Sequence, residues 1–526
     1  MTADLLFASP RPLSRSGATI DERASRLAGG LAALGMEDGD VIAVMLRNDP
    51  VFADMIRACR VAGCFYCPIN WHFKADEVLH LLNDSGAKLL LIHADLHATI
   101  AAQLPPSLPV LLVDPSGQSI QAPLQDQPGA PQPGASASST SRIHRYEAWL
   151  ARQTPYAGPT RNVRGHMAYT SGTTGRPKGV RRQAVPAHER EQQLAAMRTV
   201  VAATFGIRPE IRTLVSAPLY HSAPSLFAQQ ALDQGSLMVL APRFDAGQTL
   251  ELIERYRIET VFLVPIMFVR LLRLPDEVRR RHDLSSLRFV ACTGAPCPPE
   301  VKRAMLDWWG PVIYETYASS ETGMITVQDP ESARSKPGSA GRPVGGARLK
   351  IVADDGRECA PGEIGRIFAR QPAFPDFEYV NNAPARAAVE RDGLVTLGDI
   401  GWVDNDGYLF LCDRATDMVI SGGVNIYPAE IEHMLLAMPE VADCAVFGVP
   451  DDEYGQSLVA VIAAAKGTQP DIDRIRTHLR AHLANYKVPR AIEFRGELPR
   501  DDNGKIAKHR LRESWLAEHA ASRRTT

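Results

Sequence analysis

Near the start of the chain, apolar residues recur at the spacing of an amphipathic helix. Before Gly35 the apolar positions fall three and four residues apart, at Ala24, Leu27, Ala28, Leu31 and Leu34. This period is close to the about 3.6 residues of a helical turn, so one face of the segment is apolar. The spacing therefore predicts a helix, and Gly35 predicts its end because glycine often terminates helices.

An unbroken apolar run, Val41 to Leu46, follows this helix. Such short apolar runs are typical of strands that are buried on both faces of a parallel sheet. The pattern then repeats, with a helical stretch at 52–61, the sequence CFYCPIN, a helical stretch at 77–82 and the run KLLLIH at 88–93. This alternation of strands and helices predicts a doubly wound α/β layer.

The rest of the chain predicts a second α/β layer followed by two other kinds of structure. Strand-like runs occur at 213–220, 236–244, 260–268 and 287–296, with a helical segment at 246–256. After about Pro343, turn signals at Asp355-Gly356 and Pro361-Gly362 separate short alternating runs, which predicts antiparallel hairpins. The stretches 444–464 and 471–483 predict a small α+β unit at the end of the chain.

Length, composition and charge narrow the class of protein. A chain of 526 residues is longer than one core usually serves, so two or more folding units are expected. Its 45% hydrophobic and 22% charged residues are those of an ordinary globular protein, and a net charge of -2 gives no overall basic field for nucleic acid. No apolar run approaches the about 18 residues of a membrane helix, so we expect a cytoplasmic protein without an integral membrane segment.

Two local features predict structure rather than chemistry. The segment from Gln121 to Arg142 is rich in Pro, Gly, Ser and Gln, which predicts an exposed mobile loop. Cys64 and Cys67 form a C-x-x-C pair among apolar neighbours, and no second pair with metal-ligand spacing follows. We expect buried structural thiols here rather than a redox or metal site.

The stretch YTSGTTGRPKGV, Tyr169 to Val180, combines the residue types that bind polyphosphate. Glycines let the backbone approach an anion closely, Ser and Thr hydroxyls donate hydrogen bonds, and Lys178 supplies a positive charge. The order differs from that of the common P-loop, because Gly179 follows the lysine and no Ser or Thr follows a Gly-Lys pair. Taken alone, the stretch fits a phosphate-binding loop or a plain surface loop.

Six further motifs follow in order along the chain. They are PLYHSAP (218–224), TGAP (293–296), YETYASSETG (314–323), LGDIGWVDNDGYLFLCDR (397–414), SGGVNIYPAEIE (421–432) and PRDDNGKIAKHRL (499–511). Together with the phosphate loop, they resemble the motifs of the adenylate-forming superfamily, which contains acyl-CoA synthetases, amino-acid adenylating domains and beetle luciferases. The resemblance covers nearly the whole chain, from the helix near Ala24 to GKIAKHRL.

The resemblance implies the fold, the reaction and the cofactors. The implied fold is α/β, with a large N-terminal domain of two doubly wound α/β layers plus a small β-barrel (1–413), a hinge (414–416) and a small mobile α+β C-terminal domain (417–526). The implied reaction is that of an acid-thiol ligase: a carboxylic acid and ATP give an acyl-adenylate and pyrophosphate with Mg²⁺, and coenzyme A then forms a thioester. The expected partners are these small molecules, and a homo-oligomer is left open.

The motifs also imply which residues bind the nucleotide and the metal. The nucleotide residues are Thr170, Ser171, Gly172, Thr173, Thr174, Gly175 and Lys178 at the outer phosphates, Gly294, Ala295 and Pro296 beneath the nucleotide, and Glu315, Thr316, Tyr317 and Ser320 of the central signature. Tyr317 would offer its ring face to adenine. Ser320 stands where relatives usually have threonine, and its hydroxyl can still donate toward the α-phosphate. Glu321 matches the metal-associated carboxylate, a ligand that suits Mg²⁺.

The next motif implies the ribose site. Asp399 matches the carboxylate that accepts hydrogen bonds from both ribose hydroxyls, a task that needs an ionised, acceptor-only group. Arg414 is positioned beside it. Leu397 replaces a threonine that is common two residues before this aspartate, so a local hydrogen bond is lost while the carboxylate remains.

The remaining residues are implied to act in turn during the two steps. Lys505 matches the lysine that reaches the carboxylate and the α-phosphate during adenylation. In the second step the small domain swings about a hinge at Thr416, where relatives often carry Asp or Lys, and brings Gly422 and Gly423 close to the pantetheine of coenzyme A. His221 matches the histidine near the acyl group, which orients the carboxylate or shields the active centre.

Three features of the sequence bear on the carboxylic acid. Acetate-specific relatives close the pocket with a tryptophan three residues before the metal glutamate, whereas Ala318 stands here. Amino-acid adenylating relatives usually hold the substrate ammonium with an aspartate shortly after the PLYHSAP motif, and YHSAPSLFAQQ (220–230) contains none, which disfavours amino acids. Thr293 replaces a frequent glycine and narrows the cavity. We expect a medium- or long-chain fatty acid, with an aryl or alicyclic acid as the alternative; a ligase that loads a carrier protein and a non-catalytic binder also remain open.

Overall fold

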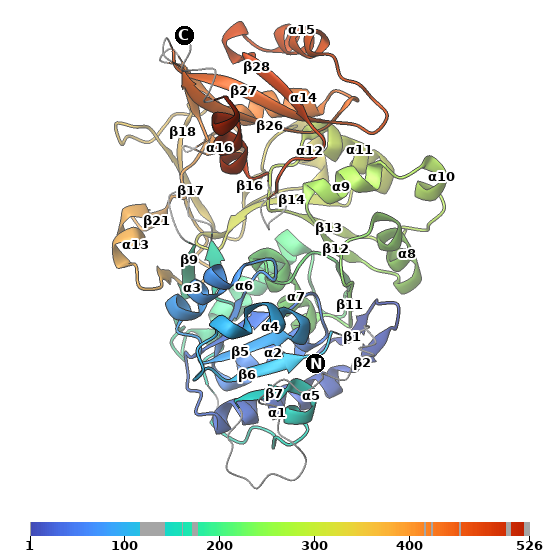
Figure 1. Ribbon diagram of the computed structural model, residues 1–526, viewed down its shortest axis with the longest axis vertical. Coiled ribbons are helices and arrows are strands. Elements are labelled where there is room, and N and C mark those ends of the chain that lie inside the picture. The colour runs from blue at the N-terminus through green and yellow to red at the C-terminus, as the bar shows by residue number, and fades with distance from the viewer. Residues whose placement is uncertain are drawn as a thin grey trace.

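The computed structural model describes residues 2–115, 142–159, 161–170, 177–414, 417–421, 424–451, 454–500 and 506–519. The molecule is elongated, with the first α/β layer at one end and the C-terminal unit at the other (Figure 1). Apart from Arg142, the predicted loop from Gln121 lies outside the described residues. No helix in the described ranges is long and apolar enough to cross a membrane.

The first α/β layer is a five-stranded parallel sheet in the order β4-β3-β5-β6-β7. Its elements are α1 (Gly17–Ala33), β3 (Val41–Met45), α2 (Val51–Ala62), β4 (Phe65–Pro68), α3 (Ala75–Ser85), β5 (Leu89–His93), α4 (Ala94–Ile100), the 3₁₀ helix η1 (Ala101–Gln103), β6 (Val110–Val113), β7 (Ile143–Arg145) and α5 (Tyr146–Leu150). Ile42 and Val44 of β3 join the core that contains α1, α2 and α5. Ala43 and Met45 join the core of α3 and α4 on the other face. The layer is therefore doubly wound, as predicted.

The second α/β layer is a nine-stranded sheet in the order β16-β15-β14-β13-β12-β10-β11-β1-β2. Its strands are β1 (Asp4–Phe7), β2 (Leu13–Arg15), β10 (Arg212–Val215), β11 (Leu237–Leu240), β12 (Thr260–Leu263), β13 (Phe289–Cys292), β14 (Ile313–Ser319), β15 (Gly323–Gln328) and β16 (Arg342–Pro343). Its helices are α6 (Arg190–Phe205), α7 (Ser222–Gln234), α8 (Ala246–Tyr256), α9 (Pro265–Leu272), α10 (Asp276–Arg279), α11 (Pro299–Trp309) and α12 (Pro330–Ser335). Strands β10 to β14 run parallel, so their carboxyl ends meet at one edge, where α/β folds commonly bind ligands.

Two smaller antiparallel sheets complete the N-terminal part. The sheet β19-β9-β8 consists of β8 (Ala168–Thr170), β9 (Lys178–Arg182) and β19 (Phe377–Tyr379), and its strands β8 and β9 flank the phosphate-loop motif. A six-stranded sheet and one helix follow: β17 (Arg348–Val352), β18 (Gly365–Arg370), α13 (Ala383–Val389), β20 (Glu390–Arg391), β21 (Leu394–Val395), β22 (Asp399–Val403) and β23 (Leu409–Arg414). The antiparallel pairing of β17 with β18 confirms the hairpins predicted beyond Pro343.

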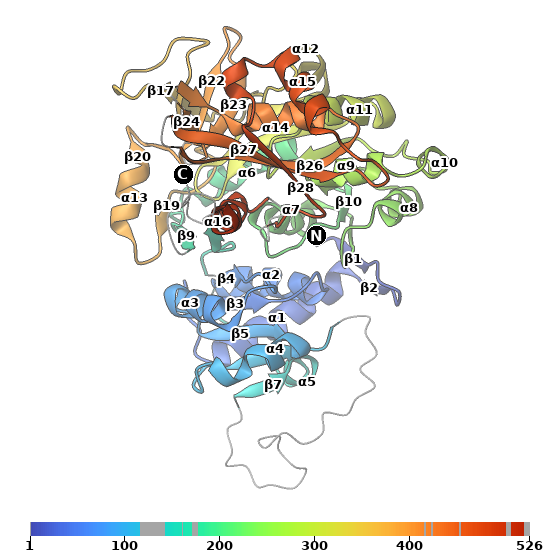
Figure 2. The ribbon, with the colours of Figure 1, turned by 45° about the horizontal axis from the view of Figure 1, so that its top comes forward.

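The C-terminal unit has hydrophobic cores of its own. It comprises β24 (Val419–Ser421), β25 (Val424–Ile426), α14 (Pro428–Leu436), β26 (Val441–Asp451), β27 (Gly455–Ala464), α15 (Ile472–His482), the 3₁₀ helix η2 (Asn485–Lys487), β28 (Ala491–Arg495) and α16 (Lys508–His519). Strands β26 and β27 pack on α14 and α15 with one face and on α16 with the other. Figure 2 shows this unit at the end opposite the first layer. The domain bounds at 414–416 stay a prediction.

Two further predictions can be compared directly with the structure. The helix predicted at 246–256 coincides with α8, whereas the run 260–268 is a strand only within β12, because Pro265 begins α9. Proline fits the first helical position, since its fixed φ suits the helix and its missing N–H is not needed there. Cys64 and Cys67 are buried free thiols, and burial raises the pKa of Cys64 to about 12, which confirms their structural interpretation.

Candidate active site

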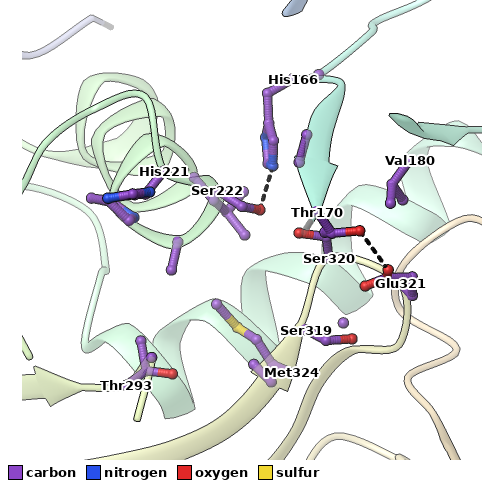
Figure 3. Close-up of a pocket in the computed structure, with 18 of the residues that line it drawn as sticks. His166, Thr170, Val180, His221, Ser222, Thr293, Ser319, Ser320, Glu321 and Met324 are labelled. Atoms are coloured by element: carbon purple, nitrogen blue, oxygen red, sulfur yellow. Dashed lines mark hydrogen bonds between the residues drawn. The ribbon is translucent and has the colours of Figure 1, made fainter. Parts of the chain in front are cut away.

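A cavity of about 1220 Å³ lies at the carboxyl ends of β10, β12 and β13, next to β8 and β9 (Figure 3). The sequence-predicted residues that line it are Thr170, Lys178, His221, Thr293, Gly294, Thr316, Ala318, Ser320 and Glu321. These residues come from segments that are far apart in the chain. The structure therefore brings most of the predicted motifs together at the edge where the parallel strands end.

Glu321 is held in one orientation at the polar end of the cavity. The residue is 5% exposed, and its Oε1 accepts hydrogen bonds from the hydroxyls of Thr170 and Tyr379, each at 3.1 Å. Thr170 ends β8 and Tyr379 ends β19, so the three-stranded sheet supplies both donors. Figure 3 shows the hydrogen bond between Thr170 and Glu321. Among the described residues, none forms a hydrogen bond with Oε2. One carboxylate oxygen is thus oriented and the other is available to a ligand.

Two cations from β9 line the same end of the cavity. The Arg182 guanidinium donates to the backbone carbonyl of Ser320, and burial lowers its pKa to about 10, although the charge of Glu321 opposes this shift. Lys178 lies at the start of β9, with its Nζ 5.2 Å from the centre of the Tyr379 ring. A polyanion beside Glu321 would therefore meet two positive charges in a largely water-excluded place.

Tyr317 and Asp399, predicted to contact adenine and ribose, are joined to each other. The Tyr317 hydroxyl donates to Oδ2 of Asp399 at 2.6 Å and so links β14 with β22. The pairing of β14 with β15 shifts register between Tyr317 and Ala318, and Ala318 lines the cavity. Gly294, at the end of β13, has a φ of +94°, a conformation that favours glycine. Tyr317 and Asp399 are thus held together, and the neighbouring Ala318 and Gly294 line the cavity.

Glu315 has a partner inside the fold instead of a place on the cavity wall. Its carboxylate forms an ion pair with the buried Lys302 and accepts the backbone N–H of Cys297 at 2.9 Å. The Glu315 charge opposes the effect of burial on Lys302, whose pKa is raised overall. The cavity lining also leaves out Ala295 and Pro296, which follow Gly294 in the turn. Their roles toward the nucleotide stay predictions.

Part of the predicted site lies outside the described residues. This part comprises Ser171, Gly172, Thr173, Thr174, Gly175, Gly422, Gly423 and Lys505, together with Thr416 of the predicted hinge. For Arg414 the structure describes the backbone, which pairs with that of Asp399 where β22 meets β23. This register places the backbone of Arg414 beside that of Asp399, and the roles of both residues toward the ribose stay predictions.

At the start of α7, Ser222 of the PLYHSAP motif meets His166, a residue that no motif predicts. Nε2 of His166 lies 2.6 Å from Oγ of Ser222, and Figure 3 shows this ring pointing toward the serine. Burial, together with the charge of Arg182, lowers the pKa of His166 to about 4, so the ring is neutral at neutral pH. His221 precedes α7 as its N-cap residue and also lines the cavity.

An apolar arm of the cavity follows α7 away from this end. Ser222, Leu226 and Gln229 are spaced four and three residues apart, so they lie on one helical face, and all three line the cavity. The other apolar side chains of the lining include Met197, Phe205, Phe262, Val264, Met267 and Met324. The cavity therefore joins a charged end to a hydrophobic arm, which suits an organic acid.

Sequence reasoning did not identify His166, Arg182 and Tyr379. Lys178, Val180 and Arg182 alternate along β9, and all three line the cavity. Alternate residues of a strand share a face, so this spacing after the phosphate loop was an available signal for Arg182. His166 and Tyr379 lie outside the motifs, and only the pairing of distant strands brings them to the site.

Comparisons with known family models and sequences agree with this geometry. The model described as AMP-binding enzyme matches residues 12–374, and the model described as AMP-binding enzyme C-terminal domain matches 430–505. The chain is 35% identical over 497 residues to a feruloyl-CoA synthase of an Amycolatopsis species, covering 94% of this chain and 93% of that protein. It is 34% identical over 496 residues to an indoleacetate–CoA ligase of Aromatoleum aromaticum, covering 93% and 91%.

A comparison with solved structures gives the same result for the fold. The amide bond synthetase McbA from Marinactinospora thermotolerans matches with a TM-score of 0.81 and 28% sequence identity, covering 98% of this chain and 97% of that chain. This match confirms the predicted α/β fold with a large N-terminal and a small C-terminal domain. The chain belongs to the family of AMP-binding enzymes and is an adenylate-forming enzyme of the AMP-forming acyl-CoA synthetase class, which works with ATP, Mg²⁺ and coenzyme A.

Proposed function

We propose that this enzyme forms the coenzyme A thioester of a hydrophobic carboxylic acid that contains an aromatic ring. The observation that carries the proposal is one continuous cavity, which joins Glu321 and Thr170 to an arm lined by aromatic side chains. Phe205 and Phe262 belong to this lining, although each is at most 1% exposed, and they meet edge to face with ring centres 6.0 Å apart. The names of the feruloyl-CoA synthase and the indoleacetate–CoA ligase also support a ring-containing acid.

A medium- or long-chain fatty acid, the acid expected from Ala318, is the second candidate. Met197, Met267 and Met324 line the arm as well, and unbranched methionine side chains adapt to flexible aliphatic chains. Both candidates place the carboxylate at the same polar end. They differ only in what fills the arm, so direct competition between the two kinds of acid distinguishes them.

The residues at the polar end suit the joining of two anions. Attack of a carboxylate on the α-phosphate brings like charges together, so the site must supply cations and donors in fixed positions. Arg182 and Lys178 supply the charge, while Thr170 donates its hydroxyl to Glu321 and so helps to hold that carboxylate in place. On the family resemblance, residues 171–175 hold the outer phosphates and Ser320 donates toward the α-phosphate.

Glu321 has the chemistry of a Mg²⁺ ligand. This ion takes oxygen ligands, and proteins usually hold it through one or two carboxylates while substrate phosphates and waters complete its shell. Oε2 of Glu321 meets this need, because the hydroxyls of Thr170 and Tyr379 fix the carboxylate through Oε1. In the described part of the chain, no cluster of three His, Cys, Asp or Glu side chains offers an all-protein cage. When bound, Mg²⁺ would neutralise phosphate charge.

The nucleoside would lie between β14 and β22. The Tyr317 hydroxyl donates to Oδ2 of Asp399 and so holds this carboxylate, which would accept hydrogen bonds from the ribose hydroxyls. The same tyrosine would present its ring to adenine, and the turn at Gly294 would lie beneath the nucleotide. Arg414, whose backbone pairs with that of Asp399, would complete the ribose site.

The two half-reactions would need two arrangements of the domains. On the resemblance, Lys505 reaches the reacting atoms from the C-terminal domain during adenylation, and a swing about 414–416 replaces it with Gly422 and Gly423 beside the thiol. His221, at the start of α7, would orient the carboxylate between the charged end and the arm.

The test is a panel of aromatic and aliphatic acids, assayed for acid-dependent pyrophosphate release with and without coenzyme A. We expect the highest kcat/KM with an aromatic acid and a thioester product only when coenzyme A is present. Lys505→Ala should slow adenylation far more than thioester formation from supplied acyl-adenylate, while the exposed Lys466→Ala in the same domain should change neither. Pyrophosphate release without consumption of coenzyme A would instead indicate a carrier protein as the acceptor.

A further inference from the structure

Gln229 is a buried polar residue on the part of the cavity wall that follows α7. It is 6% exposed and lines the cavity from α7. It is the eighth residue after His221, so at about 1.5 Å per residue it lies roughly 12 Å further along the helix. Gln229 therefore stands at the distal part of the arm, away from the reacting carboxylate.

No residue in the described part of the chain forms a hydrogen bond with the Gln229 side chain. Buried polar groups in proteins nearly always have a partner, because leaving one unpaired costs about 1–3 kcal/mol. The neighbouring Gln230 shows the contrast, since it is also buried, does not line the cavity and accepts a hydrogen bond from Gln234 at 3.1 Å. The unmet hydrogen-bonding capacity of Gln229 faces a space that a substrate would fill.

A second polar atom of the cavity wall also has no hydrogen-bond partner within the described ranges. Ser216, which follows β10, lines the same cavity, and its Oγ is buried without a hydrogen-bond partner among the described residues. A purely hydrocarbon substrate would cut the Gln229 amide off from water in the cavity without replacing its hydrogen bonds, and it would leave Ser216 Oγ unpaired. A substrate with its own polar group beside Gln229 would satisfy the amide.

We infer that Gln229 is a specificity-determining residue that selects acids with a hydroxyl substituent at the end remote from the carboxylate. An amide both donates and accepts, and so does a hydroxyl, so the two groups pair in either direction. This inference rests on the proposed function, because it assumes that the arm holds the acyl group. It narrows the substrate class from a hydrophobic acid to a hydroxylated one, whether the carrier of the hydroxyl is a ring or a chain.

The experiment compares acids that differ only in this hydroxyl. The pairs are para-hydroxycinnamate with cinnamate and an ω-hydroxy fatty acid with its parent, each assayed for acid-dependent pyrophosphate release by the full-length enzyme. For one of the two pairs, the wild-type enzyme should prefer the hydroxylated acid by roughly ten- to hundredfold in kcat/KM. In Gln229→Met and Gln229→Leu this preference should fall to about onefold, whereas the matched control Gln230→Met should keep it.

The ratio of the kcat/KM values for two acids, measured with one variant, does not depend on the fraction of active enzyme. A loss of folded protein therefore cannot imitate the result. Efficient adenylation of unsubstituted acids by the wild type, or a hydroxyl preference that survives both Gln229 variants, would overturn the inference and leave the proposed function standing. Failure of every acid to give pyrophosphate would overturn the proposed function and the inference together.

Discussion

Replacing Glu321 with glutamine tests the charge of this residue apart from its shape. Glu321→Gln keeps an oxygen at the position of Oε1, so the hydroxyls of Thr170 and Tyr379, at 3.1 Å, retain their acceptor. The other oxygen becomes an NH₂ group, which cannot bind a cation. Arg182 loses a compensating charge, but a guanidinium whose pKa is already as low as about 10 still stays protonated at neutral pH.

The burial of Glu321 sets the size of the expected effect. An exposed charge contributes only about 0–1 kcal/mol, whereas a preorganised group in a water-excluded site contributes about 3–4 kcal/mol to the transition state. At 5% exposure Glu321 belongs to the second class, so adenylation should slow by roughly 10²- to 10³-fold. Tyr379→Phe removes one hydrogen bond to the charged carboxylate but leaves the charge in place. The lost hydrogen bond should cost about 1.5–3 kcal/mol, so adenylation should slow by a smaller factor than in Glu321→Gln.

The assay separates the two half-reactions. Adenylation is measured as pyrophosphate release at saturating acid over a range of Mg²⁺ concentrations, and thioester formation is measured from supplied acyl-adenylate and coenzyme A. Glu321→Gln should depress the first and change the second by less than about threefold, since the charge acts on the phosphates. Equal losses in both half-reactions, or a smaller loss than in Tyr379→Phe, would refute the reasoning.

Three further predictions concern the arm, the core and the pH response. Ala318→Trp places an indole on the cavity wall, so kcat/KM for bulky acids should fall by roughly 10²-fold or more relative to acetate, and an unchanged ratio would exclude Ala318 from the acyl site. Lys302→Met leaves the buried carboxylate of Glu315 unpaired, which should cost about 3–5 kcal/mol and lower the apparent melting temperature by roughly 5–10 °C, as thermal scanning would show. Folding lowers the pKa of His166 from 6.5 to about 4, so the folded state disfavours protonation of this ring. Its contribution to the free energy of unfolding is therefore complete above pH 6.5, and about 3 kcal/mol of that free energy is lost as the pH falls to 4. His166→Asn should therefore show a shallower fall of melting temperature with decreasing pH, and parallel curves would contradict this account.

Apolar periodicity predicted most of the fold because burial acts on residues that are close in sequence. The apolar run that begins at Val41 predicted β3, and the amphipathic pattern at 246–256 predicted α8. β1 was not predicted, since four residues carry too weak a pattern and its strand character depends on pairing with β11. The wrong strand assignment beyond β12 has a local cause, because an apolar run alone does not distinguish a strand from the helix that Pro265 begins.

The site was predictable only where its residues lie in motifs. Thr170 and Glu321 were found in this way, and the structure joins them by a hydrogen bond. Tyr379, the second donor to Glu321, reaches the site because β19 pairs with β9, a contact between segments that are distant in sequence. Motif membership alone does not place a residue on the cavity wall, since Glu315 belongs to the central signature and is paired with Lys302 in the core, while its role toward the nucleotide stays a prediction.

The most direct test of the central claim is to look for the mixed anhydride itself. The full-length enzyme would be incubated with ATP, Mg²⁺ and the best acid of the panel but without coenzyme A, and the products would be identified by mass spectrometry. We expect an acyl-adenylate and pyrophosphate from the wild type, and far less of both from Glu321→Gln. Cleavage of ATP to ADP and phosphate, or equal yields of acyl-adenylate from the two proteins, would contradict a cavity in which Glu321 supports the attack of a carboxylate on the α-phosphate.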